Sequence, residues 1–365
     1  MPQTSHWFLS GLRHVDGILL TLVVLVLGIS LAVVTSASGQ SAARISGHLV
    51  NMGLALGVMV VIANVPPHLL SKVGPPLYVA GVVLLVGVAL FGEIRNGARR
   101  WLNLGFAFQP SELLKLALPL MLAWYFHRNE AVLRAKHYLV GGVLLLVPFL
   151  LILRQPDLGT ALMLGASGFY LLFFAGLPWK VILGAAALGA ASLPVVWSLM
   201  HDYQQRRVLM LLDPSSDPLG AGYHIIQSTI AIGSGGLFGK GWMQGTQNQL
   251  DFIPERTTDF IYAVFGEEFG YAGAILLVCL YLAIVARGLV IAARAPTLFG
   301  RLMAATLSLN LFTYVFVNMG MVSGILPVVG VPLPLMSYGG TALVTLLLGV
   351  GILMSVATHR QLNKS

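Results

Sequence analysis

Long runs of hydrophobic residues, separated by short polar segments, dominate this chain. We count ten such runs, and most approach or exceed the ~20 residues that a helix needs to cross a bilayer core. They cover residues 16–36, 46–65, 74–92, 110–127, 138–154, 158–175, 178–199, 260–286, 299–322 and 338–358. We find no internal repeat and no linker that would separate domains. The pattern predicts an all-α polytopic membrane protein, a single integral membrane domain over residues 1–365 with about ten transmembrane helices.

One polar segment is much longer than the others. It covers residues 200–259, between the seventh and eighth predicted helices. Proline and glycine flank a short apolar stretch, Tyr223–Ile232, which we expect to be a helix too short to span a membrane. Loops of this length in compact proteins are usually functional or disordered. Its glycine, amide and hydroxyl groups favour a functional loop.

The charges give the chain an orientation. Hydrophobic residues make up 57% and charged residues 9% of the chain, and the net charge is +8. Lysine and arginine gather in alternate connections and at both ends: Lys72, Arg128, Arg134, Lys136, Lys180, Arg287, Arg294, Arg301, Arg13, Arg360 and Lys364. The positive-inside rule therefore predicts cytoplasmic termini and an extracytoplasmic 200–259 loop. No basic patch is interleaved with aromatics, which argues against nucleic acid. The single cysteine, Cys279, excludes an intrachain disulfide.

The stretch IPERTTDFIYAVFGEEFG, residues 253–270, concentrates the rare charges of the chain. They are Glu255, Arg256, Asp259, Glu267 and Glu268. Asp259 lies where the polar loop meets an apolar run, and an ionisable group at a membrane edge is a functional candidate. The alternative is a helix N-cap, a role that either preceding threonine could also fill. As a base, Asp259 would have a pKa raised by Glu267 or lowered by Arg256, with Glu255 also close in sequence.

Two further charged motifs lie in or between predicted helices. Glu112 and Lys115 are three residues apart in the fourth helix and can form an ion pair. Such a pair faces the bundle interior or an aqueous cavity, and a purely structural role stays open. In RQPDLGT, residues 154–160, Asp157 is either a helix N-cap or a site residue, with Arg154 beside it on the outer side.

Basic residues on the outer side need an explanation, because the positive-inside rule disfavours them. They are Arg95, Arg99, Arg100, Arg154, Arg206, Arg207 and Lys240. They either anchor to anionic head groups or bind a phosphate of a lipid substrate.

Metal and cofactor motifs are not recognisable in the sequence. His224, Gln227 and Ser228 fall within one helical turn of the outer loop, but a lone histidine is more often a packing residue than a ligand. No HExxH or acidic calcium-loop pattern is present. A divalent cation (Mg²⁺ or Mn²⁺) that bridges one carboxylate and a substrate pyrophosphate remains compatible with the sequence.

The stretch GILPVVGVPLPLMSYGG, residues 324–340, interrupts the apolar pattern before the last helix. Proline and glycine at membrane depth are tolerated where backbone lines a cavity or is buried in protein. We predict a cavity wall that includes Ser337; a plain external turn is the alternative.

Taken together, five motifs resemble those of the SEDS family (shape, elongation, division and sporulation). They are GARRWLNLGFAFQPSELLK, RQPDLGT, AGYHIIQS with GSGGLFGKG, PERTTDFIYAVFGEE and VPLPLMSYGG. They occur in family order across nearly the whole chain, and the details are more similar to the elongation branch than to the division branch. Thr257 departs from the family, since many relatives have histidine there.

The resemblance implies a peptidoglycan glycosyltransferase that polymerises lipid II, a disaccharide-pentapeptide on undecaprenyl pyrophosphate. It implies that Asp259 is the essential residue, that the lipid-linked glycan is a further ligand, and that partners are a class B penicillin-binding protein and other elongation-complex proteins. That chemistry needs one base for an inverting displacement and cations near the leaving pyrophosphate. A lipid flippase or transporter would instead rely on Glu112 and Lys115 and often shows repeats. A scaffold would tolerate loss of Asp259.

Overall fold

The computed structural model describes residues 14–95, 98–103, 107–155, 157–200, 205, 209, 221–253 and 255–359. Ten long helices match the ten predicted runs one to one. They are α2 (Gly17–Ala37), α3 (Ala42–Ala63), α4 (Pro67–Phe91), α5 (Pro110–Arg128), α6 (Ala135–Leu153), α7 (Leu158–Phe174), α8 (Trp179–Leu199), α12 (Ile261–Arg294), α13 (Leu298–Val322) and α14 (Gly340–Thr358). Within the described residues, eight are long and apolar enough to cross a membrane. The predicted all-α polytopic fold is confirmed.

Shorter elements fill the connections. A small antiparallel sheet of β1 (Glu93–Arg95), β2 (Ala98–Asn103) and β3 (Ala107–Phe108) precedes α5, and the hydrophobic pattern did not predict it. A 3₁₀ turn, η1 (Glu130–Val132), follows α5. The long loop contains α10 (Ala221–Ser234), which is the predicted short helix, and α11 (Thr246–Gln249).

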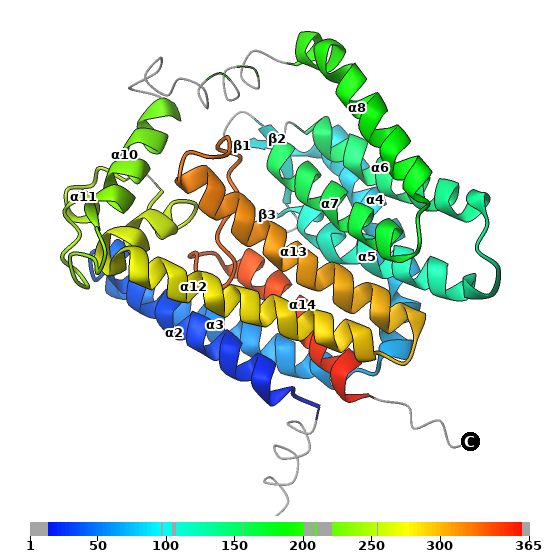
Figure 1. The fold of residues 1–365 in the computed structure, drawn as a ribbon, viewed down its shortest axis with the longest axis horizontal. Helices are drawn as coiled ribbons and strands as arrows, with labels where there is room; N and C mark the ends of the chain where they lie inside the picture. Colours follow the sequence, from blue (N-terminus) through cyan, green and yellow to red (C-terminus); the bar gives the residue numbers. More distant parts are fainter. Residues whose placement is uncertain are drawn as a thin grey trace, which may run out of the picture.

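The helices form one bundle, in which α3 packs on α14, α4 on α5 and α12 on α13 (Figure 1). Glycines allow two of these close approaches, because a Cβ on Gly351 would lie 2.6 Å from Met59 O and one on Gly74 would lie 2.8 Å from Leu120 O. Small residues at helix contacts are typical of membrane bundles. Helix α8 stands apart, and none of its apolar window is buried.

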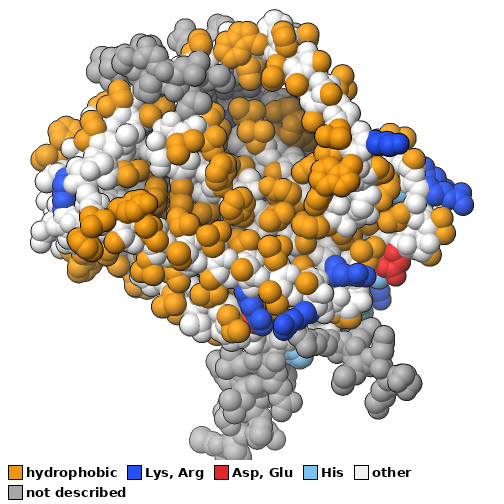
Figure 2. Space-filling model, viewed as in Figure 1, with side chains coloured by type: hydrophobic (Ala, Val, Ile, Leu, Met, Phe, Trp, Pro, Cys, Tyr) orange, Lys and Arg blue, Asp and Glu red, His pale blue; other side chains and the backbone are white. Residues whose placement is uncertain are grey.

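The first and last described residues lie together at one end of the bundle. Asp16 caps α2 and pairs with Arg287 near the end of α12, with Arg287 Nη2 2.5 Å from Asp16 Oδ2. The His14 ring stacks on His359 at 4.0 Å. Asp259 precedes the start of α12 and therefore lies at the opposite end. The face seen in Figure 2 is mostly hydrophobic, with Lys and Arg gathered along its lower and right edges.

Helix α12 is broken at Gly270, whose φ of 65° and ψ of −166° are not helical. The break frees the carbonyls of Glu267 and Glu268, which accept hydrogen bonds from the backbone N–H groups of Lys240 and Gly241, each at 3.0 Å. A Cβ on Gly239 would lie only 2.1 Å from Glu268 O. The glycine-rich motif GSGGLFGKG therefore packs into the break, and the eighth predicted run contains two helices.

Residues 325–339 connect α13 and α14 without regular structure; we call them the 325–339 segment. Three of its carbonyls accept hydrogen bonds from side chains of three helices. Asn318 of α13 donates to Val331 O at 2.7 Å, Tyr281 of α12 to Pro334 O at 2.5 Å, and Ser30 of α2 to Met336 O at 2.8 Å. Irregular backbone inside a membrane protein is tolerated when its polar groups are satisfied in this way.

Candidate active site

Asp259 lies at the end of the long loop, just before α12. The N-cap of α12 is Phe260 and no side chain caps the helix, so the structure does not show the N-cap role considered for Asp259. Three consecutive carbonyls hold this part of the loop. Thr257 O accepts from Tyr338 N at 2.8 Å, Thr258 O from Ser337 Oγ at 2.6 Å, and Asp259 O from Asn318 Nδ2 at 2.8 Å. The Asp259 carboxylate lies beside Gly330, where a Cβ would be 3.5 Å from Oδ2.

Asp259 lines a cavity of about 390 Å³. The other lining residues come from β2, the end of the long loop, the 325–339 segment and the first half of α14: Trp101, Thr258, Pro332, Leu333, Leu335, Ser337, Tyr338, Gly339, Thr341, Ala342, Leu343 and Leu346. The stretch around Ser337 is thus a cavity wall, although the Ser337 hydroxyl itself is bonded to Thr258 O and Leu333 N. Trp101 was missed as a site residue; its place in the GARRW motif was the available signal.

The surroundings of Asp259 favour its neutral form. Burial first, and then the negative charge of Glu255, raise the pKa of Asp259 from an ordinary 3.8 to about 6. A carboxyl with such a pKa is a suitable base near neutral pH, because it is mostly ionised there and still basic enough to accept a proton. Glu255, not Glu267, is the carboxylate that tunes it.

Glu267 and Arg256 are engaged elsewhere, which corrects their predicted roles as tuners. Glu267 is fully buried and accepts hydrogen bonds from Lys240 Nζ at 2.7 Å, Gln247 N at 2.9 Å and Asn248 N at 3.3 Å. Arg256 donates to the Asp251 carboxylate and, at 2.6 Å, to Asn248 O. Both side chains therefore hold the outer loop together.

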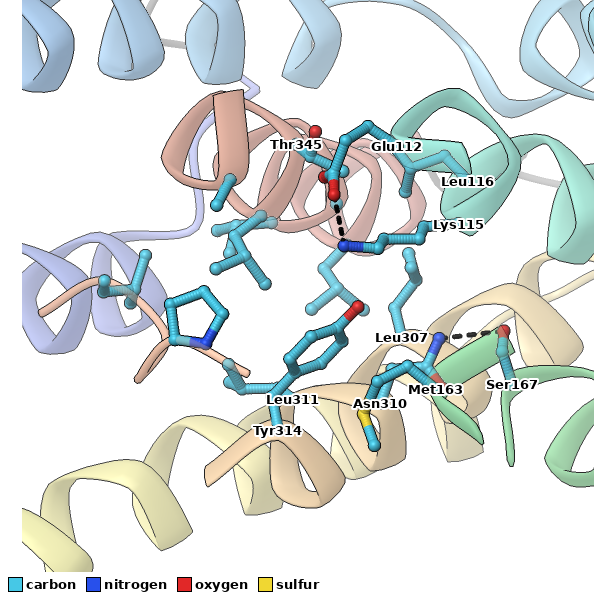
Figure 3. A pocket seen from close by; sticks show the side chains of 17 residues that line it. Glu112, Lys115, Leu116, Met163, Ser167, Leu307, Asn310, Leu311, Tyr314 and Thr345 are labelled. Atoms are coloured by element: carbon cyan, nitrogen blue, oxygen red, sulfur yellow. Dashed lines mark hydrogen bonds and ion pairs between the residues drawn. The ribbon is translucent and has the colours of Figure 1, made fainter. Parts of the chain in front are cut away.

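A second cavity, of about 70 Å³, lies among α5, α7, α13 and α14. Lys115 Nζ is 2.6 Å from Glu112 Oε1, which confirms the predicted pair, and both residues line this cavity. Figure 3 shows the Tyr314 hydroxyl turned toward the same ammonium group. The two cavities have four lining residues in common: Pro332, Leu335, Ala342 and Leu346. The cavity that contains the intramembrane pair is therefore a direct neighbour of the cavity that contains Asp259.

Among the outer basic residues, those with described side chains are largely bound to the protein. Arg100 Nε donates to Gln155 O at 3.2 Å and its guanidinium lies 3.8 Å from Asp157. Asp157 also caps α7 by accepting from Thr160 N at 3.2 Å, as the N-cap alternative predicted. Arg154 is exposed at the end of α6. Arg206, Arg207 and the side chains of Arg95 and Arg99 lie outside the described residues.

Helix α10 carries His224, Gln227 and Ser228. The His224 ring stacks on Phe260 with centroids 5.6 Å apart. Burial lowers the pKa of His224, and Glu255 opposes that shift. Ser228 is fully buried and donates to Val322 O at 2.8 Å, so it joins α10 to α13 and does not face a substrate. In the part of the chain that the structure describes, no three His, Cys, Asp or Glu side chains gather as metal ligands.

Comparison with known proteins identifies similar sequences and folds over almost the full length. Residues 15–362 match the sequence profile of a family described as "Cell cycle protein", which groups FtsW, RodA and SpoVE. The peptidoglycan glycosyltransferase MrdB of Escherichia coli K12 is 53% identical over 351 residues, 96% of this chain and 95% of MrdB.

Two solved structures are also similar. One belongs to work on "structural coordination of polymerization and crosslinking by a peptidoglycan synthase complex"; it gives a TM-score of 0.81 at 35% identity and covers 94% of this chain and 97% of its own. The other is the rod shape determining protein RodA of Thermus thermophilus, with a TM-score of 0.72 at 31% identity, covering 95% of this chain and 98% of RodA.

Proposed function

Because this chain belongs to the FtsW, RodA and SpoVE family, the SEDS peptidoglycan glycosyltransferases, we propose that Asp259 is the base of its reaction. The chain is a multi-pass membrane enzyme, and its similarity to RodA confirms the expected elongation branch. One observation carries the proposal: the Asp259 carboxyl, with a pKa of about 6, lines the larger cavity at the outer end of the bundle.

The proposed reaction joins two molecules of lipid-linked precursor. Asp259 accepts the proton of a sugar 4-hydroxyl on the acceptor, lipid II, while that oxygen forms a bond to the anomeric carbon of the donor strand. The bond from this carbon to the pyrophosphate oxygen breaks, and undecaprenyl pyrophosphate leaves with the electron pair. A single displacement of this kind inverts the anomeric carbon and needs one base.

The leaving pyrophosphate requires positive charge nearby. Lys115 is the only cation among the described side chains that line either cavity, and its cavity borders that of Asp259. We therefore assign the pyrophosphate contact to Lys115, with Glu112 orienting it. Arg100, Arg256 and Lys240 line neither cavity, which makes them weaker candidates.

A Mg²⁺ or Mn²⁺ ion bound between the pyrophosphate and one carboxylate stays a prediction. The described residues offer no cluster of three ligands, so the substrate would have to supply most of the coordination. Polymerisation that falls with EDTA and returns with added Mg²⁺ or Mn²⁺ would support this role; activity unchanged in EDTA would refute it.

We further propose that both termini are cytoplasmic and that Asp259 faces the periplasm. The Asp16–Arg287 pair and the stacked rings of His14 and His359 lie at one end of the bundle, near the edges where Lys and Arg gather in Figure 2, and Asp259 lies at the other end. The similar synthase complex couples polymerization with crosslinking, which supports a class B penicillin-binding protein, the crosslinking transpeptidase, as the partner of this chain within an elongation complex.

The test is reconstitution of the purified protein with lipid II, alone and with its transpeptidase partner. We expect glycan strands with the wild type and none with Asp259→Asn, an isosteric change that keeps the fold. The alternative, a lipid flippase, is supported only by the intramembrane position of the Glu112–Lys115 pair. It predicts lipid II translocation in vesicles without strand synthesis, and normal strand synthesis by Asp259→Asn would overturn the base assignment.

A further inference from the structure

Asn318 occupies an unusual position between two parts of the site. It lies in the last turns of α13 and is fully buried. Its side-chain nitrogen donates two hydrogen bonds, one to Asp259 O at 2.8 Å and one to Val331 O at 2.7 Å. One amide group therefore joins the backbone that carries the proposed base to the cavity wall opposite it.

The other hydrogen bonds between residues 257–259 and the 325–339 segment have donors of a different origin. Tyr338 N and Ser337 Oγ hold the carbonyls of Thr257 and Thr258, and both donors belong to the 325–339 segment itself. Among the described residues, the side chain that donates to the carbonyl of Asp259 is Asn318, which belongs to helix α13 and not to the segment. Through its Nδ2 atom, Asn318 therefore connects the loop that carries Asp259 and the 325–339 segment to helix α13.

Asn318 holds the backbone of Asp259 and the backbone of Val331 close together, and the space between the Asp259 carboxylate and the segment is narrow. Gly330, next to Val331, has a φ of 68°, and a Cβ there would already be in contact with Asp259 Oδ2 at 3.5 Å. The Asp259 carboxylate therefore packs against backbone, and its direction depends on how far Val331 lies from Asp259. A displacement of about 1 Å at a reacting group can cost about 100-fold in rate.

We propose that Asn318 is a positioning residue for the reaction, which sets the separation and direction of the Asp259 carboxylate relative to the 325–339 segment. The proposal rests on the role of Asp259 as the base. Asn318 does not line either cavity, so it acts through Asp259 and does not touch the substrate. Loss of its amide should lower turnover and leave substrate affinity nearly unchanged.

The experiment compares Asn318→Leu, which has a similar size and no donor, with Tyr281→Phe. Tyr281 also donates to the 325–339 segment, at Pro334 O, but has no hydrogen bond to residues 257–260, and it lines neither cavity. Both variants are assayed with the transpeptidase partner on lipid II from pH 5 to 9, with thermal unfolding in detergent as a measure of folding.

For Asn318→Leu we expect kcat to fall about 10- to 100-fold with KM within about threefold. The acid limb of the pH profile should also move to lower pH, because a less constrained carboxyl becomes better hydrated. For Tyr281→Phe we expect a comparable loss of thermal stability with kcat within about twofold and the acid limb unchanged. If Asn318→Leu does not fold, Asn318→Ser, which keeps one donor, should show the same changes to a smaller extent.

Wild-type kcat and an unchanged acid limb in folded Asn318→Leu or Asn318→Ser would overturn the proposal. Equal effects of Tyr281→Phe on kcat and pH profile would overturn it too, because any bond to the segment would then suffice. Asp259→Asn is assayed in parallel: if it stays active, the base assignment fails, whereas an inactive Asp259→Asn beside an active Asn318→Leu removes only the positioning role.

Discussion

Glu255→Gln should shift the pH dependence of polymerisation to lower pH. The carboxylate of Glu255 accepts a hydrogen bond from Thr258 Oγ1 at 3.0 Å, and the residue is exposed. Its negative charge is the second cause, after burial, of the raised pKa of Asp259. Gln keeps the size of the side chain and one oxygen that can accept the hydrogen bond, and it removes the negative charge.

The magnitude follows from the size of the shift. The pKa of Asp259 rises from 3.8 to about 6, a difference of about 2. Burial is the larger cause, so Glu255 accounts for less than half of this, below about 1 pH unit. At pH 5 a carboxyl with a pKa of about 6 is ionised in roughly one molecule in ten. Lowering that pKa by about 0.5 to 1 raises the ionised fraction to about a quarter to a half, hence about a two- to fivefold faster rate.

The assay is strand formation from lipid II at saturating substrate between pH 5 and 9, with the partner protein present. The variant should exceed the wild type at pH 5 and approach it at pH 8, where Asp259 is ionised in both. Because Glu255 is exposed, the difference should shrink at high ionic strength. Asp251→Asn is the matched control, since Asp251 is a carboxylate on the same loop that does not contribute to the pKa of Asp259.

An acid limb that does not move in Glu255→Gln, or that moves upward, would refute the reasoning. An equal shift in Asp251→Asn would mean that the general charge of the loop, and not Glu255, controls Asp259.

Three further predictions concern stability and the intramembrane pair. A raised pKa in the folded state means that Asp259 stabilises the protein below about pH 4 and that this contribution is lost as the pH rises through 6. Asp259→Asn should therefore raise the free energy of unfolding above pH 6 by at most about 3 kcal/mol, measured as a higher melting temperature, and the gain should vanish near pH 4. Glu267→Gln should destabilise the outer loop by about 1–3 kcal/mol, because it leaves Lys240 without its charged partner, and proteolysis of the loop should be faster. Glu268→Gln is the control and should have a smaller effect. The neutral double variant Glu112→Gln/Lys115→Gln should unfold like the wild type yet polymerise at least about tenfold more slowly; recovery of normal strand synthesis would show that the pair is only structural.

The helices and the position of the proposed base could be predicted from local sequence. A run of about 20 apolar residues can satisfy its own backbone only as a helix, so hydropathy alone located all ten. Asp259 stood out because a carboxylate beside such a run is costly to hold. The interruption at residues 324–340 was visible for a similar reason, since proline and glycine do not continue a helix.

The partners of the charged side chains could not be read in this way. Spacing along a helix suggested Glu267 as the neighbour of Asp259, but the break at Gly270 and the glycine-rich segment packed into it bring Lys240 and two backbone N–H groups to Glu267 instead. Gly270 lies in the eighth predicted run together with Gly266 and Gly273, which keep helical backbone, so a glycine at this place does not by itself mark the break. The contact of Asn318 with Asp259 spans 59 residues and depends on the whole bundle.

The hydrogen bonds that the backbone carbonyls of the 325–339 segment accept have a consequence for the order in which the protein assembles during synthesis. Val331, Pro334 and Met336 accept their hydrogen bonds from α13, α12 and α2, and α2 leaves the ribosome long before the other two helices. Until these three helices have associated, the segment has no partners for its backbone and cannot settle at membrane depth. The wall of the catalytic cavity should therefore be among the last parts to assemble, after α14 has been inserted, so that the enzyme acquires its active site only once the entire chain has been synthesised.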